Sequence, residues 1–337
     1  MIVFGVAVTH ADVYERFALP GIRRAAEADS AVLAHHTAGS VFHNYNVLLD
    51  KAAEHDDLEA LVLVHQDAEI VDSDFAATIR GAFADPDVAV VGCVGAVGVR
   101  SIAWWQGAVT WAAVTHRYRE HGGGEFPAMA WDPREIPAYA EHGEVDSIDG
   151  VVMALSPWAV RELRFDESLG RLHGYDFDIC MQARAACKKV VTADFRTIHH
   201  HSLQLINDPE AWKASYIRLA EKWADQLPDP GADQGDRALR AEAEAACAMA
   251  LAVTNGYRFE AVNRQRARTK GELDTARREL EAATRRLETA GKELDATRSQ
   301  LRTLLASRSW RLTEPLRRLR RVFRGAGSRE SPGSDLT

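Results

Sequence analysis

The stretch Leu61-Val62-Leu63-Val64-His65-Gln66-Asp67-Ala68-Glu69 decides how the rest of the chain is interpreted. Its first four residues are apolar, which is typical of a short strand buried on both faces of a parallel sheet. The polar triplet of His65, Gln66 and Asp67 follows at the carboxyl end of that strand, where ligands bind in open α/β sheets. A carboxylate fixed by a strand is suited to hold Mg²⁺ or Mn²⁺ and, through the metal, a substrate phosphate. The alternative is that Asp67 only begins a loop and contacts water.

Apolar strands alternate with helical segments on both sides of this stretch. Between residues 42 and 55 the apolar side chains recur at helical spacing, and Asp72 or Ser73 can cap the helix that runs to Ala84. The alternation predicts an α/β fold with a doubly wound, mostly parallel sheet and right-handed crossovers. The expected strands are 2–8, 31–35, 61–64, 88–94, 151–155 and 189–193, and the expected helices include 21–28, 42–55 and a segment that starts near Asp176.

The alternation is interrupted between residues 95 and 146. This segment contains Trp104, Trp105, Trp111 and Trp131 together with a run of three glycines. Long irregular segments inside a compact domain are usually functional or disordered, and the tryptophans argue against disorder. We interpret part of the segment as a mobile cover or a platform for a second substrate, and an ordinary packed insertion is the alternative.

Acidic residues and histidines cluster after the irregular segment. Asp176 and Asp178 lie where a helix starts, and there backbone N–H groups favour negative charge. Both can be simple helix caps, which is our preferred interpretation of Asp178. In the run from His199 to His201, an extended backbone places the first and third imidazoles on one face, where they can bind a divalent metal. A solvated loop would also tolerate this run.

Composition limits the classes of function. The 337 residues include 46% hydrophobic side chains, enough for a sizeable core, and the net charge of −8 argues against general binding of nucleic acid. The four cysteines show no C-x-x-C spacing, which is typical of reduced cysteines in a cytosolic protein. We also expect no signal peptide and no membrane-spanning segment.

The last third of the chain has a different character. Residues 227–257 are expected to form a linker and an alanine-rich helix, and leucines recur every seven residues within 258–306. That heptad pattern predicts a coiled coil through which copies of the chain can associate, although a lone solvated helix is the alternative. Residues 307–324 predict a basic amphipathic helix for an anionic membrane surface or, alternatively, an acidic protein partner. Residues 325–337 are expected to be a disordered tail.

Residues 1–226 together resemble a family 2-type glycosyltransferase of the GT-A fold, from a branch with His-Gln-Asp in place of Asp-x-Asp. The resemblance rests on the order and spacing of several motifs, and the segment from Ser309 to Arg317 also resembles one near the ends of bacterial surface-polysaccharide glycosyltransferases. The motifs are Tyr45-Asn46, His65-Gln66-Asp67, Asp149-Gly150, Tyr175-Asp176-Phe177-Asp178 and the histidines after the last strand.

The resemblance implies a role for each matching residue. It makes Asp176 the general base, and it makes Asp67 a ligand of Mn²⁺ or Mg²⁺ together with His199 or His201. It implies donor binding by Thr9, His10, Asn46, His65, Gln66 and Asp67. It implies acceptor binding by Asp149, Gly150 and Tyr175, to which the irregular segment adds Trp104. Two departures from the family pattern are Tyr175 in place of Glu and His65 in place of the first Asp.

The expected function is therefore transfer of a sugar from a nucleotide-diphosphate donor to an acceptor hydroxyl with inversion. The acceptor would be a glycan or a lipid-linked molecule in the synthesis of bacterial surface polysaccharide, and the protein would be cytoplasmic or peripheral at the inner face of the membrane. A non-catalytic scaffold that binds sugar or nucleotide and acts through its coiled coil is the alternative. A dehydrogenase is disfavoured because Val6-Ala7-Val8-Thr9-His10 replaces the glycine-rich motif after the first strand.

Overall fold

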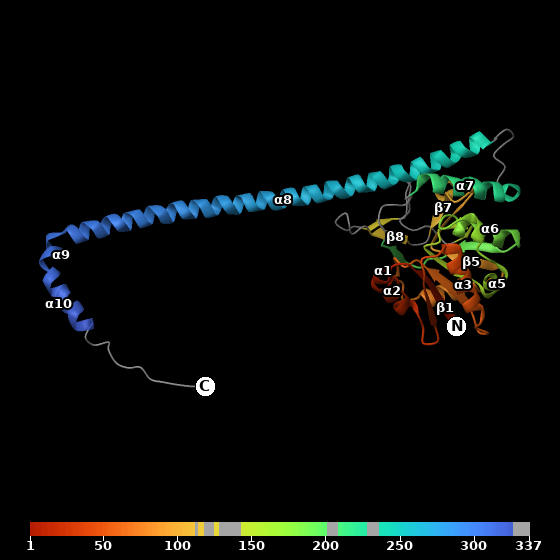
Figure 1. Ribbon diagram of the computed structural model, residues 1–337, viewed down its shortest axis with the longest axis horizontal. Helices are drawn as coiled ribbons and strands as arrows, with labels where there is room; N and C mark the ends of the chain where they lie inside the picture. The colour runs from red at the N-terminus through yellow and green to blue at the C-terminus, as the bar shows by residue number, and fades with distance from the viewer. Residues whose placement is uncertain (112–113, 118–124, 128–142, 201–207, 228–235, 326–337) are drawn as a thin grey trace. The chain divides into compact units, whose positions relative to one another are not determined.

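The computed structural model describes the chain except for residues 112–113, 118–124, 128–142, 201–207, 228–235 and 326–337 (Figure 1). The chain forms two compact units, Met1–Gln265 and Arg266–Thr337. The first unit therefore extends beyond residue 226 and contains the beginning of helix α8 (Asp236–Ala306). Ala243, Ala246 and Cys247 from this alanine-rich part of α8 are buried in the hydrophobic core of that unit.

A seven-stranded sheet organises the first unit, with strand order β10-β13-β5-β12-β3-β1-β2. Its strands are β1 (Ile2–Val8), β2 (Ala31–His36), β3 (Ala60–Val64), β5 (Val88–Gly92), β10 (Glu144–Val145), β12 (Val152–Leu155) and β13 (Lys189–Thr192). Only β12 and β10 run against the other five strands of this sheet, so the predicted mostly parallel sheet is confirmed.

Strand β3 lies in the interior of this sheet. It pairs with β1 in the parallel sense and with β12 in the antiparallel sense, and all five of its residues are buried. A strand with neighbours on both sides and helices over the sheet has no solvated face, which explains its run of valine, leucine and alanine. His65, Gln66 and Asp67 follow β3 directly, so they lie at the carboxyl end of an interior strand of the sheet.

Helices pack against the sheet where the apolar spacing predicts them. α3 begins at Val41, after Ser40 accepts a hydrogen bond from the N–H of Phe42 at 3.3 Å, and its buried side chains include Tyr45 and Leu48. α3 and α5 pack against each other, α3 against β1 and α5 against β12. The helices of the first unit before α8 are α1 (Ala11–Arg16), α2 (Ala18–Ala25), α3 (Val41–Ala53), α4 (Phe75–Ala82), α5 (Pro157–Glu162), α6 (Tyr175–Ala185) and α7 (Pro209–Lys222).

The structure differs from the sequence expectations at several boundaries. The segment 88–94 is not one strand, because the chain leaves the main sheet at Cys93 and continues as β6 (Val94–Val97) in a separate sheet with order β11-β6-β7. The helix expected over 21–28 begins earlier and is preceded by α1. The N-cap residue of α4 is Asp74, so neither Asp72 nor Ser73 occupies the cap position. The Asp72 carboxylate instead accepts a hydrogen bond from the N–H of Asp74. The remaining strands are β4 (Ala68–Ile70), β7 (Ala108–Trp111), β8 (Val114–Arg117), β9 (Glu125–Pro127), β11 (Ser147–Ile148) and β14 (Thr197–His199).

The second unit is helical in its described part. It contains the rest of α8, followed by α9 (Arg308–Leu312) and α10 (Glu314–Gly325). α9 begins after Ser307, whose hydroxyl accepts from the N–H of Trp310 at 3.2 Å and so ends α8. The expected tail falls almost wholly on residues 326–337, outside the described part. No helix among the described residues has the length and apolar character that crossing a bilayer requires.

Candidate active site

Three potential metal ligands converge where β3 and β14 end. β14 pairs with β4 in the antiparallel sense, with His199 opposite Ala68, and the N–H of His200 donates to the carbonyl of Asp67 at 2.8 Å. This pairing brings Nε2 of His199 to 3.3 Å from Oδ1 of Asp67. One potential ligand atom from each of His65, Asp67 and His199 lies within 4.8 Å of the others, and we call these three residues the His-Asp-His triad.

The spacing of the triad suits one divalent cation. Neighbouring ligands around an octahedral cation with bonds of about 2.1 Å lie roughly 3 Å apart, and opposite ligands lie roughly 4.2 Å apart. The distance of 3.3 Å between His199 and Asp67 matches neighbouring ligands in that geometry, and the ligand atom of His65 lies within 4.8 Å of both. Two imidazoles and one carboxylate are also a common donor set for first-row transition metals. The residues therefore fit the metal that the sequence predicted, with His65 as an additional ligand.

The two histidines of the triad differ in their tendency to carry a proton. Burial lowers the pKa of His65, and this outweighs the opposing charge of Asp67. Burial also lowers the pKa of His199, but the charge and the hydrogen bond of Asp67 outweigh it, so the pKa of His199 is raised overall. When His199 is protonated, it forms an ion pair with Asp67. A bound cation would take the place of that proton.

Tyr175 orients His65 from the start of α6. The Tyr175 hydroxyl and Nε2 of His65 form a hydrogen bond of 2.5 Å, and the tyrosine is 6% exposed. Gly150 makes room for this ring, because a Cβ at that position would lie 2.5 Å from both the ring carbon Cε2 and the hydroxyl of Tyr175. Gly150 was predicted to bind the acceptor. In the structure, a larger residue at this position would clash with the Tyr175 ring.

Two carboxylates lie beside the triad, one after β11 and one on α6. Oδ2 of Asp176 accepts from the N–H of Gly150 at 3.0 Å, Oδ1 accepts from the N–H of Phe177 at 2.9 Å, and Asp149 accepts from the N–H of Val151 at 3.0 Å. Burial and the negative charge of Asp149 raise the pKa of Asp176 to about 7, against the opposing effect of the backbone N–H groups. A carboxylate with such a pKa can exchange a proton near neutral pH.

Two pockets meet at the triad. The first, which we call the β1 pocket, has a volume of about 260 Å³ and is lined by Thr9, Gln66 and Arg171 among others. The second, which we call the tryptophan cleft, has a volume of about 300 Å³ and is lined by the acidic pair Asp149 and Asp176 together with aromatic side chains. Its aromatic lining comprises Trp104, Trp105, Tyr175 and Trp212. Both pockets are also lined by His65, Asp67 and Leu172.

Gln66 ties the ends of β1 and β3 together at the β1 pocket. Its Oε1 accepts from the N–H groups of Thr9 and His10, both at 2.9 Å, and its Nε2 donates to the Thr9 hydroxyl at 2.8 Å. Both ends of the Gln66 amide are therefore hydrogen-bonded to other residues of the protein, and these bonds fix the edge of the pocket. Of the three residues, Thr9 and Gln66 line the β1 pocket, whereas His10 is absent from the described lining of both pockets.

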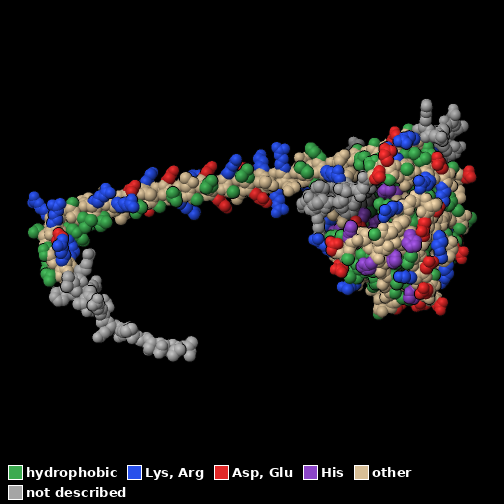
Figure 2. All heavy atoms as spheres, in the orientation of Figure 1, with side chains coloured by type: hydrophobic (Ala, Val, Ile, Leu, Met, Phe, Trp, Pro, Cys, Tyr) green, Lys and Arg blue, Asp and Glu red, His purple; other side chains and the backbone are tan. Residues whose placement is uncertain are grey.

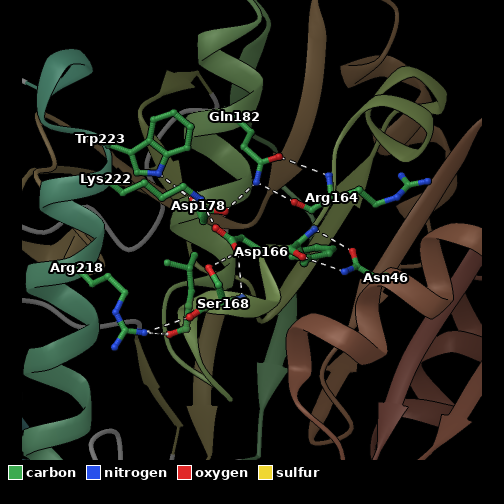
Figure 3. A network of polar contacts seen from close by, with 11 residues as sticks. Asn46, Arg164, Asp166, Ser168, Asp178, Gln182, Arg218, Lys222 and Trp223 are labelled. Carbon is green, nitrogen blue, oxygen red and sulfur yellow. Dashed lines mark hydrogen bonds and ion pairs between the residues drawn. The ribbon is translucent and has the colours of Figure 1, made fainter.

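Asn46 lies outside the described lining of both pockets. Its Nδ2 donates to the carbonyl of Phe165 at 2.9 Å, and its Oδ1 accepts from the N–H of the same residue, also at 2.9 Å (Figure 3). The amide therefore holds the segment that leads from α5 toward α6. This position gives Asn46 a supporting role in the architecture and no direct contact with either pocket.

Asp178 is the centre of a buried polar network rather than a helix cap, so our preferred interpretation of it was wrong (Figure 3). Its carboxylate is 1% exposed and accepts from Nε1 of Trp223 at 2.9 Å and from Nε2 of Gln182 at 2.8 Å. Nζ of Lys222 lies 2.7 Å from Asp178 and 2.7 Å from Asp166. These contacts fix α6, which carries Tyr175 and Asp176, to the end of α7.

Sequence reasoning missed several lining residues. Arg171 and Leu172 lie in a short segment between Gly170 and Gly174, whose φ angles of +129° and +89° are in the region that favours glycine. The spacing of these two glycines was a signal for a tight connection at a site. Trp105 and Trp212 stack with ring centroids 5.7 Å apart, a contact that no local pattern could indicate. His201, the other predicted metal ligand, lies outside the described residues.

The chain is similar to several known proteins. Streptomycin biosynthesis protein StrF of Streptomyces griseus is 29% identical over 231 residues, which cover 68% of this chain and 76% of that protein. Two solved structures show partial similarity. A mannosyltransferase from Pyrobaculum calidifontis, PcManGT, in complex with GDP-Man and Mn²⁺ is 15% identical, with a TM-score of 0.39 over 75% of this chain and 73% of that chain. GalNAc-T7 with UDP, GalNAc and Mn²⁺ is 11% identical, with a TM-score of 0.43 over 72% of this chain and 54% of that chain.

The family match covers the site described above. The model of the glycosyltransferase like family matches residues 4–217, a range that includes the triad, both pockets and helices α1 to α7 apart from the last turn of α7. The α/β fold expected from the sequence is confirmed in its mostly parallel sheet and its long C-terminal helix. The chain belongs to the glycosyltransferase-like family.

Proposed function

We propose that this protein is a metal-dependent enzyme that transfers a sugar from a nucleotide diphosphate to an acceptor hydroxyl, with inversion of the anomeric centre. The observation that carries the proposal is the position of the His-Asp-His triad at the junction of two pockets, one of which contains Asp176. A donor in one pocket and an acceptor in the other would meet at the triad. Membership of the glycosyltransferase-like family supports sugar transfer as the reaction.

The β1 pocket is the proposed site of the nucleotide diphosphate. Gln66 fixes the edge of this pocket through Thr9, so the rim is formed before the donor binds. Arg171 lines the same pocket and offers a permanent positive charge to the diphosphate. This charge becomes more useful as the bond to the sugar breaks, since the leaving diphosphate gains negative charge.

His65, Asp67 and His199 would hold the divalent cation. Imidazole ligands favour Mn²⁺ over Mg²⁺ at such a site, because Mg²⁺ prefers oxygen ligands. When bound, the cation supplies a Lewis acid that stabilises charge on the phosphate oxygens. Tyr175 keeps the His65 ring in a fixed orientation through its hydrogen bond.

Asp176 is the proposed general base in the tryptophan cleft. Its pKa of about 7 allows it to be ionised at neutral pH and still accept a proton from a hydroxyl, a step worth about 10²- to 10⁴-fold in rate. The acceptor hydroxyl would attack the anomeric carbon as its proton passes to Asp176. A single displacement of this kind inverts the configuration. The rings of Trp104 and Trp105 would provide a flat apolar wall for the acceptor.

The acceptor is proposed to be a glycan or a lipid-linked molecule of bacterial surface-polysaccharide synthesis, handled in the cytoplasm at the inner face of the membrane. The similarity to a streptomycin biosynthesis protein, StrF, suggests another setting, the biosynthesis of a small molecule. The basic C-terminal helix favours the first setting, because it would keep the enzyme close to lipid-linked substrates.

The experiment that tests the proposal is a turnover assay with UDP-, GDP-, dTDP- and CDP-sugars, each with Mn²⁺ or with EDTA. We expect release of one nucleoside diphosphate in the presence of Mn²⁺, and loss of that activity in EDTA and in Asp67→Asn. The matched control is Asp56→Asn, an exposed acid before β3, which should retain activity. Nucleotide binding without turnover across the whole panel would contradict the proposal and favour a non-catalytic scaffold.

A further inference from the structure

The end of the second unit carries positive charge and apolar side chains on the same short segment. Residues 308–325 contain seven arginines and one glutamate, a net charge of +6 in a chain whose net charge is −8. In Figure 2 the blue arginine side chains of α9 and α10 stand beside green apolar ones. The exposed apolar side chains of the two helices are Trp310 (40%), Leu312 (79%), Leu316 (68%) and Leu319 (55%).

The spacing of these side chains defines one apolar stripe. On α10, Leu316 and Leu319 are separated by three residues, as required for one face of a helix. Arg317 holds α9 and α10 together. Its Cζ lies 3.6 Å from the ring centroid of Trp310, its Nη1 donates to the Thr313 hydroxyl at 2.6 Å, and its Nη2 donates to the Trp310 carbonyl. The tryptophan is thus fixed beside the stripe, where an indole ring suits the boundary between water and lipid.

We propose that α9 and α10 bind the surface of a membrane that contains anionic lipid. The leucine and tryptophan side chains would enter the boundary between headgroups and acyl chains, while the arginines contact phosphate headgroups. An acidic protein could satisfy the charge, but a stripe of single leucines bordered closely by arginines matches the layered polarity of a lipid surface. The proposal is independent of the reaction that the first unit catalyses.

The test is sedimentation of the full chain with vesicles of phosphatidylcholine alone or with 30% phosphatidylglycerol. We expect binding to the anionic vesicles and little to the neutral ones, with affinity that falls as salt is raised. Each arginine near an anionic surface changes affinity about fivefold, so Arg318→Gln with Arg321→Gln should weaken binding about 25-fold. Leu316→Glu with Leu319→Glu should abolish binding.

The matched control removes the same charge elsewhere in the second unit. Arg278→Gln with Arg285→Gln lies outside both the apolar stripe of α10 and the leucine positions of α8, and it should bind vesicles as the unchanged chain does. Circular dichroism verifies that each variant keeps its helices. Equal sedimentation with both lipid mixtures, or unchanged binding of the Arg318/Arg321 variant, would overturn the proposal.

A separate observation concerns the leucines of α8. Five leucines with a spacing of seven residues are roughly half to three-quarters exposed, and the residues three positions after them are alanine, threonine or leucine. In a heptad the spaced leucines occupy position a, and the alanine, threonine and leucine residues three positions after them occupy position d. The leucines are Leu273 (49%), Leu280 (68%), Leu287 (77%), Leu294 (52%) and Leu301 (54%).

The flanking charges indicate which partner covers this seam. In a parallel pair of identical helices in register, each g residue faces the e residue five positions later on the other helix. Here Glu272 would face Arg277, and Glu293 would face Arg298, both with opposite charges. The other facing pairs within 272–305 each contain at least one uncharged residue, so the parallel register brings no like charges together. We infer that a second copy of this chain covers the seam as a parallel two-stranded coiled coil.

Ultracentrifugation and cross-linking test this second inference. The full chain should sediment at twice its mass of 37.2 kDa, and Leu280→Asp with Leu287→Asp should sediment as a monomer. Leu273→Cys should form a disulfide-linked dimer under oxidation, whereas the unchanged chain, in which Cys187 is the exposed cysteine among the four, controls for other thiols. In an antiparallel pair two copies of residue 273 would lie about 40 Å apart and could not be linked. A monomeric chain, or a dimer that Leu273→Cys fails to link, would overturn the inference.

Discussion

The raised pKa of Asp176 makes a prediction about stability as well as about catalysis. The carboxyl group has a pKa of about 7 in the folded protein, compared with 3.8 without the influence of the fold. A folded-state pKa above the unfolded one means that the folded protein binds the proton more tightly. Stability is therefore highest below pH 3.8 as far as this group is concerned, and it falls as pH rises from there to about 7. At 1.36 kcal/mol per pKa unit, the full loss is on the order of 4 kcal/mol.

Replacing Asp176 with Asn removes the charge with little change of shape. Asparagine can accept from only one of the two N–H groups that the carboxylate binds, those of Gly150 and Phe177, so the substitution loses about 1–2 kcal/mol of hydrogen bonding. At pH 8 the substitution also removes the destabilisation of about 4 kcal/mol that the buried charge causes, and this gain outweighs the lost hydrogen bond. Asp176→Asn should therefore be roughly 2–3 kcal/mol more stable than the unchanged protein. At pH 5, where Asp176 is already protonated, the variant should be equally stable or slightly less stable.

Urea unfolding followed by circular dichroism at pH 5, 6, 7 and 8 measures this difference, with EDTA present so that metal does not contribute. The same variant should lose about 10²- to 10⁴-fold in kcat and retain nucleotide binding, since the base acts on the acceptor. In the unchanged enzyme, kcat/KM should fall as pH is lowered through about 7. An Asp176→Asn variant that is less stable at pH 8 would show that the buried charge is not destabilising, and one that keeps full activity would show that Asp176 is not the general base.

Three further substitutions test other parts of the site. Gly150→Ala places a Cβ 2.5 Å from the Tyr175 ring, so it should cost about 1–3 kcal/mol in urea unfolding and weaken Mn²⁺ binding, and unchanged Mn²⁺ affinity in calorimetry would argue against the role of Tyr175. Arg171→Ala should weaken binding of the nucleoside diphosphate about tenfold and of the monophosphate much less; equal losses for both would show that the guanidinium does not contact the terminal phosphate. Asp178→Ala removes the buried acceptor of Nε1 of Trp223 and leaves Lys222 paired with Asp166 alone, so a loss of about 3 kcal/mol is expected in urea unfolding, whereas a loss below 1 kcal/mol would show that the network is dispensable.

Features fixed by neighbouring residues could be predicted from the sequence. The apolar run of β3, the helical spacing that buries Tyr45 and Leu48, and the cap of α7 all depend on a few consecutive positions. The cap is a clear case, because Asp208 accepts from the N–H groups of Glu210 and Ala211 as expected at such a site.

Features that depend on pairing between distant segments could not be predicted in the same way. The antiparallel entry of β12 between β3 and β5 depends on how a long irregular segment returns the chain to the sheet. The His-Asp-His triad was predicted in part, because Asp67 and His199 were named as candidate ligands, whereas the approach of His199 to His65 and Asp67 depends on the pairing of β14 with β4. Asn46 and Gln66 were predicted to bind the donor. In the structure their side-chain amides form hydrogen bonds with backbone groups that are distant in sequence.

Metal binding by the His-Asp-His triad can be tested directly by a crystal structure of the protein with Mn²⁺ and the nucleoside diphosphate that stabilises it, recorded with the anomalous signal of manganese. We expect one strong anomalous peak within about 2.5 Å of ligand atoms from His65, Asp67 and His199, with the diphosphate beside it in the β1 pocket. A bound nucleotide with no manganese at the triad, or manganese bound elsewhere in the protein, would contradict this expectation.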